Sequence, residues 1–272
     1  MSGGSPRVLL LAAGYGRRLA PFTDEVPKCL MPINGRPLLG LWLDMMTRAG
    51  LSDITINTHY LAEQVTDWLD RAGWLDRVDL VYEPTLLGTG ATLARLAQTG
   101  GADGPVMLVH ADNLSLFSVP QFLNAHAQRR EKVVMTMMTF ATDNPKNCGV
   151  VELDSDGVVI GFHEKSQNPP SNLANAAVYI LEPEVAALAH RLGRSGADFS
   201  TQIIPRLMGR IQTFHNGLYH RDIGSPDSLT VAQVEYPMAE ERAAACGVAA
   251  PQAPPMRWLY QGTKLIAAMD AG

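Results

Sequence analysis

Apolar residues follow two periods along the first half of the chain. Residues 8–13 form a continuous apolar run that ends at Gly14, the pattern of a strand buried on both faces of a parallel sheet. Residues 38–49 instead carry apolar side chains three or four positions apart, and Gly50 supplies a stop signal. The chain is therefore predicted to open with a strand, a loop and a helix.

The same alternation continues as far as residue 129. Strands are predicted at 54–58, 78–82 and 106–110, and helices at 61–69, 91–97 and 119–129. Strands separated by helices of this length imply right-handed crossovers. The first half therefore predicts an α/β fold with a mostly parallel sheet flanked by helices.

The pattern becomes mixed after residue 133. Strands are predicted at 133–140, 150–153, 158–162, 174–181 and 211–214, with helices at 183–192 and 226–236. An Asp-Ser-Asp-Gly segment at 154–157 predicts a hairpin turn. Residues 238–256 are rich in Ala, Glu and Pro, so we expect a linker there, followed by a short terminal segment around residues 258–268.

Composition and charge narrow the class of partner. The 272 residues carry a net charge of −5, which argues against nucleic acid as a partner because phosphate-backbone binding needs accumulated positive charge. No apolar stretch approaches the roughly 20 residues that a spanning helix needs, and three widely spaced cysteines support neither a disulfide framework nor a zinc site. We therefore expect a cytoplasmic protein without a membrane partner.

Positive charge is nevertheless concentrated near the start, where five Lys or Arg residues face only two acidic ones as far as residue 40. This local excess suggests a small anionic ligand. The segment Leu11-Ala12-Ala13-Gly14-Tyr15-Gly16-Arg17-Arg18-Leu19 follows the first predicted strand. Glycines let backbone N–H groups approach phosphate oxygens, and arginine offers a planar fork for them.

Spacing excludes the dinucleotide-binding loop Gly-x-Gly-x-x-Gly, because residue 19 is Leu rather than Gly. It also excludes the P-loop, because no Gly-Lys-Ser/Thr ends the segment. The glycines alone fit a bare turn equally well. Arg18 and Lys28, ten residues apart, make the pattern specific. Together with the Leu-Ala-Ala-Gly-x-Gly run, they resemble the signature of the sugar-1-phosphate nucleotidylyltransferases.

This resemblance covers about residues 7–234 and implies a Rossmann-like core with a smaller mixed β region that binds the sugar. On that basis residues 1–236 would form the nucleotidyltransferase domain, with the nucleotide-binding core at about 7–140 and the sugar-binding region at about 141–222. Residues 237–272 would form the linker and terminal segment.

The resemblance also implies roles for individual residues. Arg18 and Lys28 would be catalytic, and the nucleotide would be bound by Leu11, Ala12, Ala13, Gly14, Gly16, Arg17, Glu83, Gly88 and Thr89. The sugar phosphate would be bound by Gly149, Glu164, Lys165 and Asn175. Two structural alternatives stay open: Thr89 as a simple helix cap, and Glu164 with Lys165 as a solvated charge pair.

A magnesium site is implied by two aspartates that end predicted strands or precede a helix. Asp112 in His-Ala-Asp-Asn, where Ala111 replaces the usual glycine, and Asp222 in Arg-Asp-Ile-Gly-Ser-Pro would hold Mg²⁺. A hard divalent cation needs only one or two carboxylates besides substrate phosphates. The alternatives are a turn aspartate at 112 and a plain N-cap with proline at 225–226.

The implied reaction joins a nucleoside triphosphate to a sugar 1-phosphate. Details around Glu83-Pro84 and residues 31–37 look most like guanylyltransferases acting on mannose or manno-heptose 1-phosphates. Uridylyl- or thymidylyltransfer, a non-catalytic regulatory subunit and a dinucleotide-dependent oxidoreductase remain as alternatives. The presence of Arg18, Lys28 and both aspartates favours an enzyme; a homo-oligomer stays open.

Overall fold

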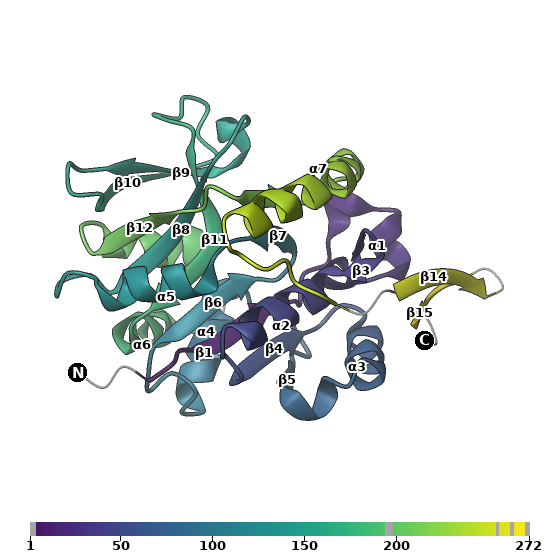
Figure 1. Ribbon diagram of the computed structural model, residues 1–272. Helices are drawn as coiled ribbons and strands as arrows, with labels where there is room; N and C mark the ends of the chain where they lie inside the picture. Colours follow the sequence, from purple (N-terminus) through teal and green to yellow (C-terminus); the bar gives the residue numbers. More distant parts are fainter. Residues whose placement is uncertain (1–3, 194–197, 254–255, 262–263, 270–272) are drawn as a thin grey trace. The chain divides into compact units, whose positions relative to one another are not determined.

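The structure is a computed structural model in which residues 4–193, 198–253, 256–261 and 264–269 are described. Its chain divides into two compact units, whose helices and strands are labelled in Figure 1. Unit 1 comprises residues 1–9, 87–109 and 119–217, and unit 2 comprises residues 10–86, 110–118 and 218–272. Each unit is thus built from three separate stretches of chain.

In its described residues, unit 1 combines strands with three α-helices. Its elements are the start of β1 (Arg7–Leu11), α4 (Thr89–Gln98), β6 (Val106–His110), α5 (Val119–Ala127), β8 (Met135–Ala141), β9 (Gly149–Leu153), β10 (Val159–Glu164), β11 (Leu173–Leu181), α6 (Pro183–Arg191) and β12 (Ile211–His215). The strand order is β10-β9-β11-β6-β1, with β8 between β11 and β12. β11 runs antiparallel to β6 and β8, whereas β12 runs parallel to β8.

Unit 2 contains the end of β1 and the helices and strands of its three stretches. Its elements are α1 (Phe22–Glu25), β2 (Pro32–Ile33), β3 (Arg36–Pro37), α2 (Leu38–Arg48), β4 (Ile54–Thr58), α3 (Ala62–Arg71), β5 (Asp79–Tyr82), β7 (Asn113–Leu116), β13 (Tyr219–Asp222), α7 (Pro226–Ala245), β14 (Met256–Gln261) and β15 (Lys264–Met269). Within this unit β1, β4 and β5 are neighbours in that order, and β4 and β5 are parallel. β7 and β13 form a separate antiparallel pair.

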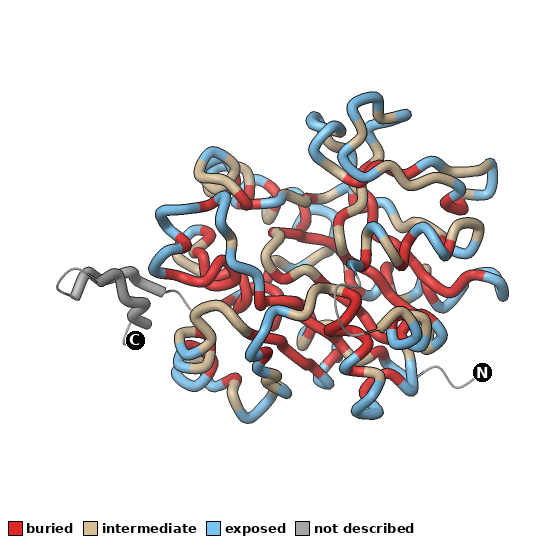
Figure 2. The backbone as a smooth tube through the Cα atoms, turned by 180° about the vertical axis from the view of Figure 1, so that it is seen from behind, coloured by how far each residue is buried: buried red, intermediate tan, exposed pale blue. Residues whose placement is uncertain are grey.

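The predicted fold class is confirmed, since the protein is a mixed α/β protein with a mostly parallel central sheet flanked by helices. The continuous apolar run at residues 8–13 predicted a buried strand, and four of the five residues of β1 are buried, as are all five of β4 (Figure 2). The helices α2, α3 and α6 also begin and end within two residues of the predicted bounds.

The predicted end of the last helix is wrong, because α7 continues beyond residue 236 to Ala245. Residues 238–245 were expected to belong to a linker. Their Ala, Glu and Arg side chains are strong helix formers, and Ala239 and Ala243 are buried, which outweighs the cost of Pro237 inside the helix. Gly247, with φ of 74°, follows the end of the helix.

Several short elements were not predicted: β7, the β2–β3 pair and the terminal strands β14 and β15. Residues 254–255, 262–263 and 270–272 of the expected terminal segment lie outside the described residues. The expected domain boundaries near residues 140, 222 and 236 stay predictions. Among the described helices, none has the length and apolar character to cross a bilayer.

Candidate active site

The loop after β1 is held in a conformation that requires glycine at one position. Gly16 has a φ of 64°, and a Cβ there would lie 2.8 Å from Cγ2 of Thr23. The hydroxyl of Thr23 donates to the carbonyl of Gly16 at 3.0 Å. Gly14 has no such restriction, because a Cβ there would meet nothing within 4 Å. The second glycine therefore fixes the turn.

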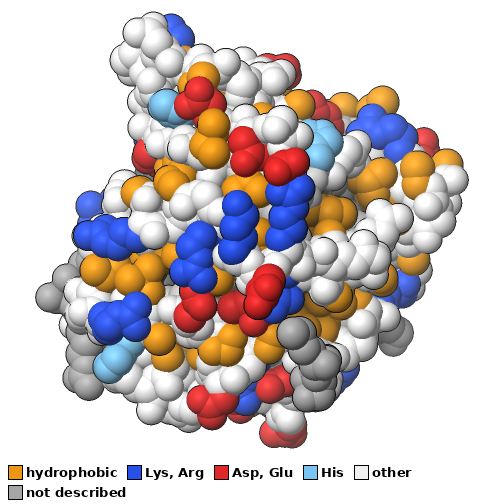
Figure 3. Space-filling view, turned by 90° about the vertical axis from the view of Figure 1, so that its left-hand side faces the viewer, with side chains coloured by type: hydrophobic (Ala, Val, Ile, Leu, Met, Phe, Trp, Pro, Cys, Tyr) orange, Lys and Arg blue, Asp and Glu red, His pale blue; other side chains and the backbone are white. Residues whose placement is uncertain are grey.

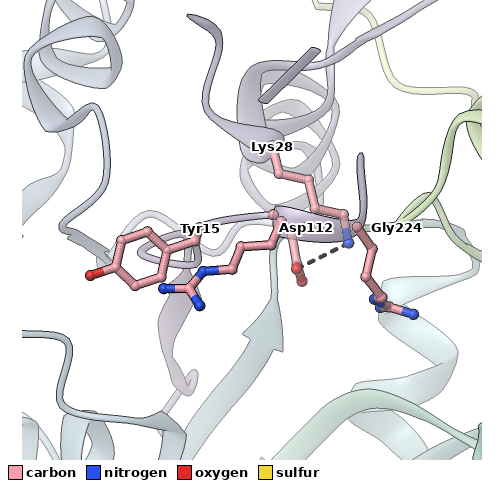
Figure 4. A pocket seen from close by; sticks show the side chains of 7 residues that line it. Tyr15, Lys28, Asp112 and Gly224 are labelled. Atoms are coloured by element: carbon pink, nitrogen blue, oxygen red, sulfur yellow. Dashed lines mark hydrogen bonds and ion pairs between the residues drawn. The ribbon is translucent and has the colours of Figure 1, made fainter. Parts of the chain in front are cut away.

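Two predicted basic residues and two predicted aspartates come together beside this loop, and Figure 4 shows Lys28 and Asp112 of this group. Lys28 Nζ lies 3.1 Å from Oδ2 of Asp112 and 2.9 Å from Oδ1 of Asp222. Arg18 Nη2 lies 3.0 Å from the other oxygen of Asp222. The structure thus joins the four residues in one chain of ion pairs, all within unit 2.

Local structure explains why the two aspartates meet although they are 110 positions apart. Asp112 is the second of the two residues between β6 and β7, and Asn113 begins β7. β7 pairs with β13 so that Asp222 stands opposite Asn113. The β7–β13 pair therefore places the two aspartates close enough for one ammonium group to contact both.

Burial and charge oppose each other at Lys28. Burial lowers the pKa of Lys28, but the carboxylates of Asp112 and Asp222 outweigh this effect and the net pKa lies above its ordinary value. Burial likewise raises the pKa of Asp222, and the charges of Lys28 and Arg18 reverse that shift, so its pKa is lowered. Lys28 and Asp222 therefore both carry their charge at neutral pH.

The pocket at this site has a volume of about 270 Å³ and is lined by Tyr15, Gly16, Arg17, Arg18, Lys28, Asp112 and Gly224. One face of the molecule shows Lys and Arg side chains gathered among carboxylates (Figure 3). Gly224 was not predicted as a site residue. A Cβ there would lie 2.7 Å from Nη2 of Arg18 and 2.8 Å from Oδ1 of Asp222, so glycine leaves room for both side chains.

The donor set fits the expected magnesium ion. Asp112 and Asp222 supply hard carboxylate oxygens and already share one cationic group, the ammonium of Lys28. Their side chains are 36% and 46% exposed, so both are open to solvent, and Asp112 also lines the pocket. No group of three or more His, Cys, Asp or Glu side chains suited to a metal occurs among the described residues. Two carboxylates suffice for Mg²⁺ when substrate phosphates complete its shell.

The backbone of the loop is tied to the predicted base-binding glutamate through a residue that the sequence did not reveal. The N–H of Ala12 donates to Oδ1 of Asn57 at 2.9 Å, and Nδ2 of Asn57 donates to Oε1 of Glu83 at 2.9 Å. Asn57 and Glu83 are both buried. In the sequence, Asn57 could have been noticed only as a polar residue inside the strand predicted at 54–58.

Gly88 and Thr89 belong to unit 1 and begin α4. Gly88 has a φ of 90° and precedes the helix without a side-chain cap. The alternative that Thr89 caps the helix is therefore wrong. The hydroxyl of Thr89 instead accepts a hydrogen bond from the backbone N–H of Phe199 at 2.9 Å.

The predicted sugar-phosphate residues lie on neighbouring strands of unit 1. Gly149 stands opposite Glu164 in the β9–β10 pair, and a Cβ on Gly149 would lie 2.7 Å from Oε2 of Glu164. Lys165 Nζ lies 3.7 Å from Glu164 Oε1. Asn175 is on β11 and donates to the hydroxyl of Tyr179 at 2.7 Å. Tyr179, which is fully buried, was not predicted.

Comparison with known proteins settles the family. The sequence model of the family described as "Nucleotidyl transferase" matches residues 7–238. The chain belongs to the nucleotidyl transferase family. The resemblance inferred from Arg18 and Lys28 is thus confirmed.

Curated relatives include mannose-1-phosphate guanylyltransferases. The catalytic subunit beta from Drosophila melanogaster is 29% identical over 235 residues, which cover 84% of this chain and 62% of the relative. The enzyme from Mycobacterium tuberculosis is 29% identical over 226 residues, 81% of this chain and 62% of its own length. This nucleotidyltransferase therefore spans about 62% of the length of these relatives.

Solved structures show the same fold. A putative glucose-1-phosphate thymidylyltransferase from Bacillus anthracis superposes with a TM-score of 0.75 at 19% identity, covering 85% of this chain and 95% of its own. HddC from Yersinia pseudotuberculosis, complexed with GMP-PN, gives a TM-score of 0.71 at 21% identity, with 85% and 100% coverage. The nucleotidyltransferase fold is common to all three.

Proposed function

We propose that this nucleotidyltransferase transfers a nucleoside monophosphate from a triphosphate to a sugar 1-phosphate and releases pyrophosphate. The observation that supports the proposal most strongly is the position of Lys28 between Asp112 and Asp222, with Arg18 on the second aspartate. Such a cluster offers both cations for phosphates and carboxylates for a divalent metal.

In the proposed reaction an oxygen of the sugar phosphate attacks the α-phosphorus of the triphosphate. The new bond is phosphorus–oxygen, and the bond from the α-phosphorus to the bridging oxygen breaks, so pyrophosphate leaves with the electron pair. The nucleophile is already an anion and needs no base. Positioning and charge neutralisation then supply most of the catalysis.

Lys28 and Arg18 would contact different phosphates in this reaction. Lys28 is buried and fixed by two carboxylates, so its ammonium is positioned to face the α-phosphate and the sugar phosphate. Arg18 is 74% exposed and can extend its guanidinium to the triphosphate and the developing pyrophosphate. Asp112 and Asp222 would hold Mg²⁺, which supplies positive charge to the phosphate oxygens when bound.

We favour GTP as the nucleotide and a mannose- or heptose-type 1-phosphate as the acceptor. The support is that curated relatives are named mannose-1-phosphate guanylyltransferases and that one solved neighbour is complexed with GMP-PN. A glucose-1-phosphate thymidylyltransferase from Streptomyces antibioticus is also similar, at 28% identity. Thymidylyl or uridylyl transfer is therefore the second candidate.

A substrate panel tests the proposal. The enzyme is incubated with magnesium and each of GTP, UTP, dTTP, CTP and ATP, in combination with several sugar 1-phosphates, and pyrophosphate release is measured. We expect the largest kcat/KM with GTP and mannose 1-phosphate or a manno-heptose 1-phosphate. Turnover with another nucleotide and none with GTP would reject the guanylyl assignment, and no pyrophosphate from any pair would reject the enzyme.

A further inference from the structure

Tyr15 occupies the phosphate-binding loop between its two glycines. Its side chain is 37% exposed and lines the pocket that contains Lys28 and Asp112 (Figure 4). An exposed aromatic ring in a loop of glycines and arginines has no role in the hydrophobic core. The contacts of its ring and of its hydroxyl indicate what it does instead.

The ring of Tyr15 supports the guanidinium of Arg17, whose Cζ lies 4.9 Å from the ring centroid. This is the geometry of a cation–π contact. Arg17 also lines the pocket, and among the described residues it forms no ion pair. Lys28 and Arg18 are both bound to aspartates. Arg17 is thus the lining cation whose charge no carboxylate offsets.

The hydroxyl of Tyr15 is anchored in turn. It lies 2.9 Å from Nε2 of His59, and Nδ1 of His59 lies 2.7 Å from the carbonyl oxygen of Glu83. Since a carbonyl only accepts, Nδ1 carries the proton, and in the neutral ring Nε2 accepts from the Tyr15 hydroxyl. The Tyr15 ring is therefore held at its hydroxyl end.

A second aromatic ring fixes the other side of the loop. Tyr60 packs against Tyr15 with centroids 5.4 Å apart, and its hydroxyl donates to the carbonyl of Thr23 at 2.8 Å. Thr23 holds the carbonyl of Gly16. The ring and the loop around it are thus fixed before any ligand arrives, which lowers the cost of ordering an arginine on binding.

We propose that Tyr15 is a positioning residue that presents Arg17 to the terminal phosphates of the nucleotide and to the leaving pyrophosphate. The inference rests on the proposed function and adds a third cation to its phosphate site. Tyr15 acts through Arg17 and touches no reacting atom. The ligand recognised is a pyrophosphate group, either free or as the β- and γ-phosphates of a nucleoside triphosphate.

The test compares Tyr15→Leu, Tyr15→Phe, Arg17→Met and the double variant Tyr15→Leu/Arg17→Met. Pyrophosphate binding is measured by calorimetry, and KM for the triphosphate and kcat by pyrophosphate release. We expect Tyr15→Leu to weaken pyrophosphate binding and raise KM about two- to fivefold, the size of one exposed cation–π contact. Tyr15→Phe keeps the ring and should restore most of this loss.

The double variant decides whether Tyr15 acts through Arg17. If it does, the double variant binds pyrophosphate no more weakly than Arg17→Met alone, because the contact is already lost. Nucleoside monophosphate binding should change in none of the variants. Arg77→Met is the matched control, since Arg77 also lies over an aromatic ring, at 3.9 Å from the centroid of Trp74, and does not line the pocket.

Three results would overturn the inference: additive losses in the double variant, an equal loss of monophosphate binding, or unchanged pyrophosphate binding in Tyr15→Leu. The folded state of each variant is checked by urea unfolding, and Arg17→Met against Arg77→Met gives the same comparison if Tyr15→Leu fails to fold. A wild-type protein that neither binds pyrophosphate nor releases it from any nucleotide rejects the proposed function instead.

Discussion

At the scale of single residues, the site depends on how charges are paired. Lys28 is almost completely buried, and two carboxylates offset the cost of burying its ammonium. The spacing of Arg18 and Lys28 could be seen in the sequence because both lie in one short segment. The partners of Lys28 could not be predicted from spacing, since they come from distant parts of the chain.

Replacing Lys28 with methionine keeps the length of the side chain and removes its charge. We expect the turnover number to fall by about 10² to 10³, the usual cost of losing one preorganised electrostatic contact. Steady-state pyrophosphate release measures the change. Lys146→Met, at an exposed lysine of unit 1, is the control. Near-normal turnover in Lys28→Met would remove Lys28 from the proposed chemistry.

Gly16→Ala tests the loop conformation itself. The positive φ disfavours alanine, and the new Cβ would lie 2.8 Å from Thr23 Cγ2 and 3.1 Å from Lys28 Cβ. We expect a loss of about 1 to 3 kcal/mol in the free energy of unfolding, measured with urea.

Gly14→Ala is the matched control for stability, because its Cβ would have open space. It should change the free energy of unfolding by less than about 0.5 kcal/mol. Equal losses at the two glycines would show that strain at Gly16 is not the cause.

At the scale of elements, periodicity predicted most of the structure and failed at short strands that carry no apolar pattern or turn signal of their own. β6 has the predicted bounds because its first four residues are apolar and buried, and β4 has them although only its two isoleucines are apolar, since all five of its residues are buried. β7 was missed because its four residues follow β6 after only two others, with Asn113 at the start and no turn signal of their own. Its partner β13 is a polar segment, Tyr-His-Arg-Asp, which no apolar pattern marks.

A buried histidine joins three elements of unit 1. His126 on α5 lies 2.7 Å from Thr136 Oγ1 on β8 and 2.9 Å from Glu182 Oε1, directly before α6. Arg129 also binds Glu182, and Gln212 donates to Thr136. Burial, assisted by Arg129 and opposed by Glu182, lowers the pKa of His126 below its ordinary value of 6.5.

This shift makes the stability of the protein depend on pH. The unfolded chain binds a proton at His126 near pH 6.5, whereas the folded chain does so only at lower pH, so stability is lost as pH falls from 6.5 toward the folded pKa. His126→Gln should show a smaller decrease between pH 7 and pH 5 in urea unfolding. His220, whose pKa burial lowers to about 4, titrates in both proteins and cancels in the comparison. Identical pH profiles would exclude a contribution of His126.

At the scale of the whole molecule, the candidate active site is assembled from separated stretches of chain. Lys28, Asp112 and Asp222 come from the three stretches that form unit 2. The sequence could suggest each residue by resemblance, but only strand pairing brings them together, and the partner β7 was unseen. Asn57 left only the signal of a polar residue in a predicted strand, and Tyr15 lies in the glycine-arginine motif without a spacing that assigned it a role.

Arg36 connects α7 and the segment that follows it to the first stretch of unit 2. Its Nη1 donates to the carbonyl of Pro251 at 2.7 Å, and Nη2 lies 2.8 Å from Glu240 Oε1. Arg36→Met should lower the free energy of unfolding by about 2 to 3 kcal/mol, because Glu240 would be left largely buried without its cation. Urea unfolding measures the loss, with Arg71→Met at an exposed arginine of α3 as the control.

Adding Glu240→Leu to Arg36→Met separates the two contributions. We expect part of the lost stability to return, because the unpaired carboxylate is removed with its partner. A double variant that is less stable than Arg36→Met would mean that Glu240 stabilises α7 independently of Arg36.

The separation of the three stretches also governs when activity can begin during synthesis and refolding. Asp222 follows the described strands of the larger sheet along the chain, so a nascent polypeptide has these strands before its second carboxylate exists. Early folding intermediates should be catalytically silent even where their strands are already formed. Recovery of turnover after dilution from urea should therefore lag behind recovery of secondary structure, and catalysis becomes a reporter of completed folding.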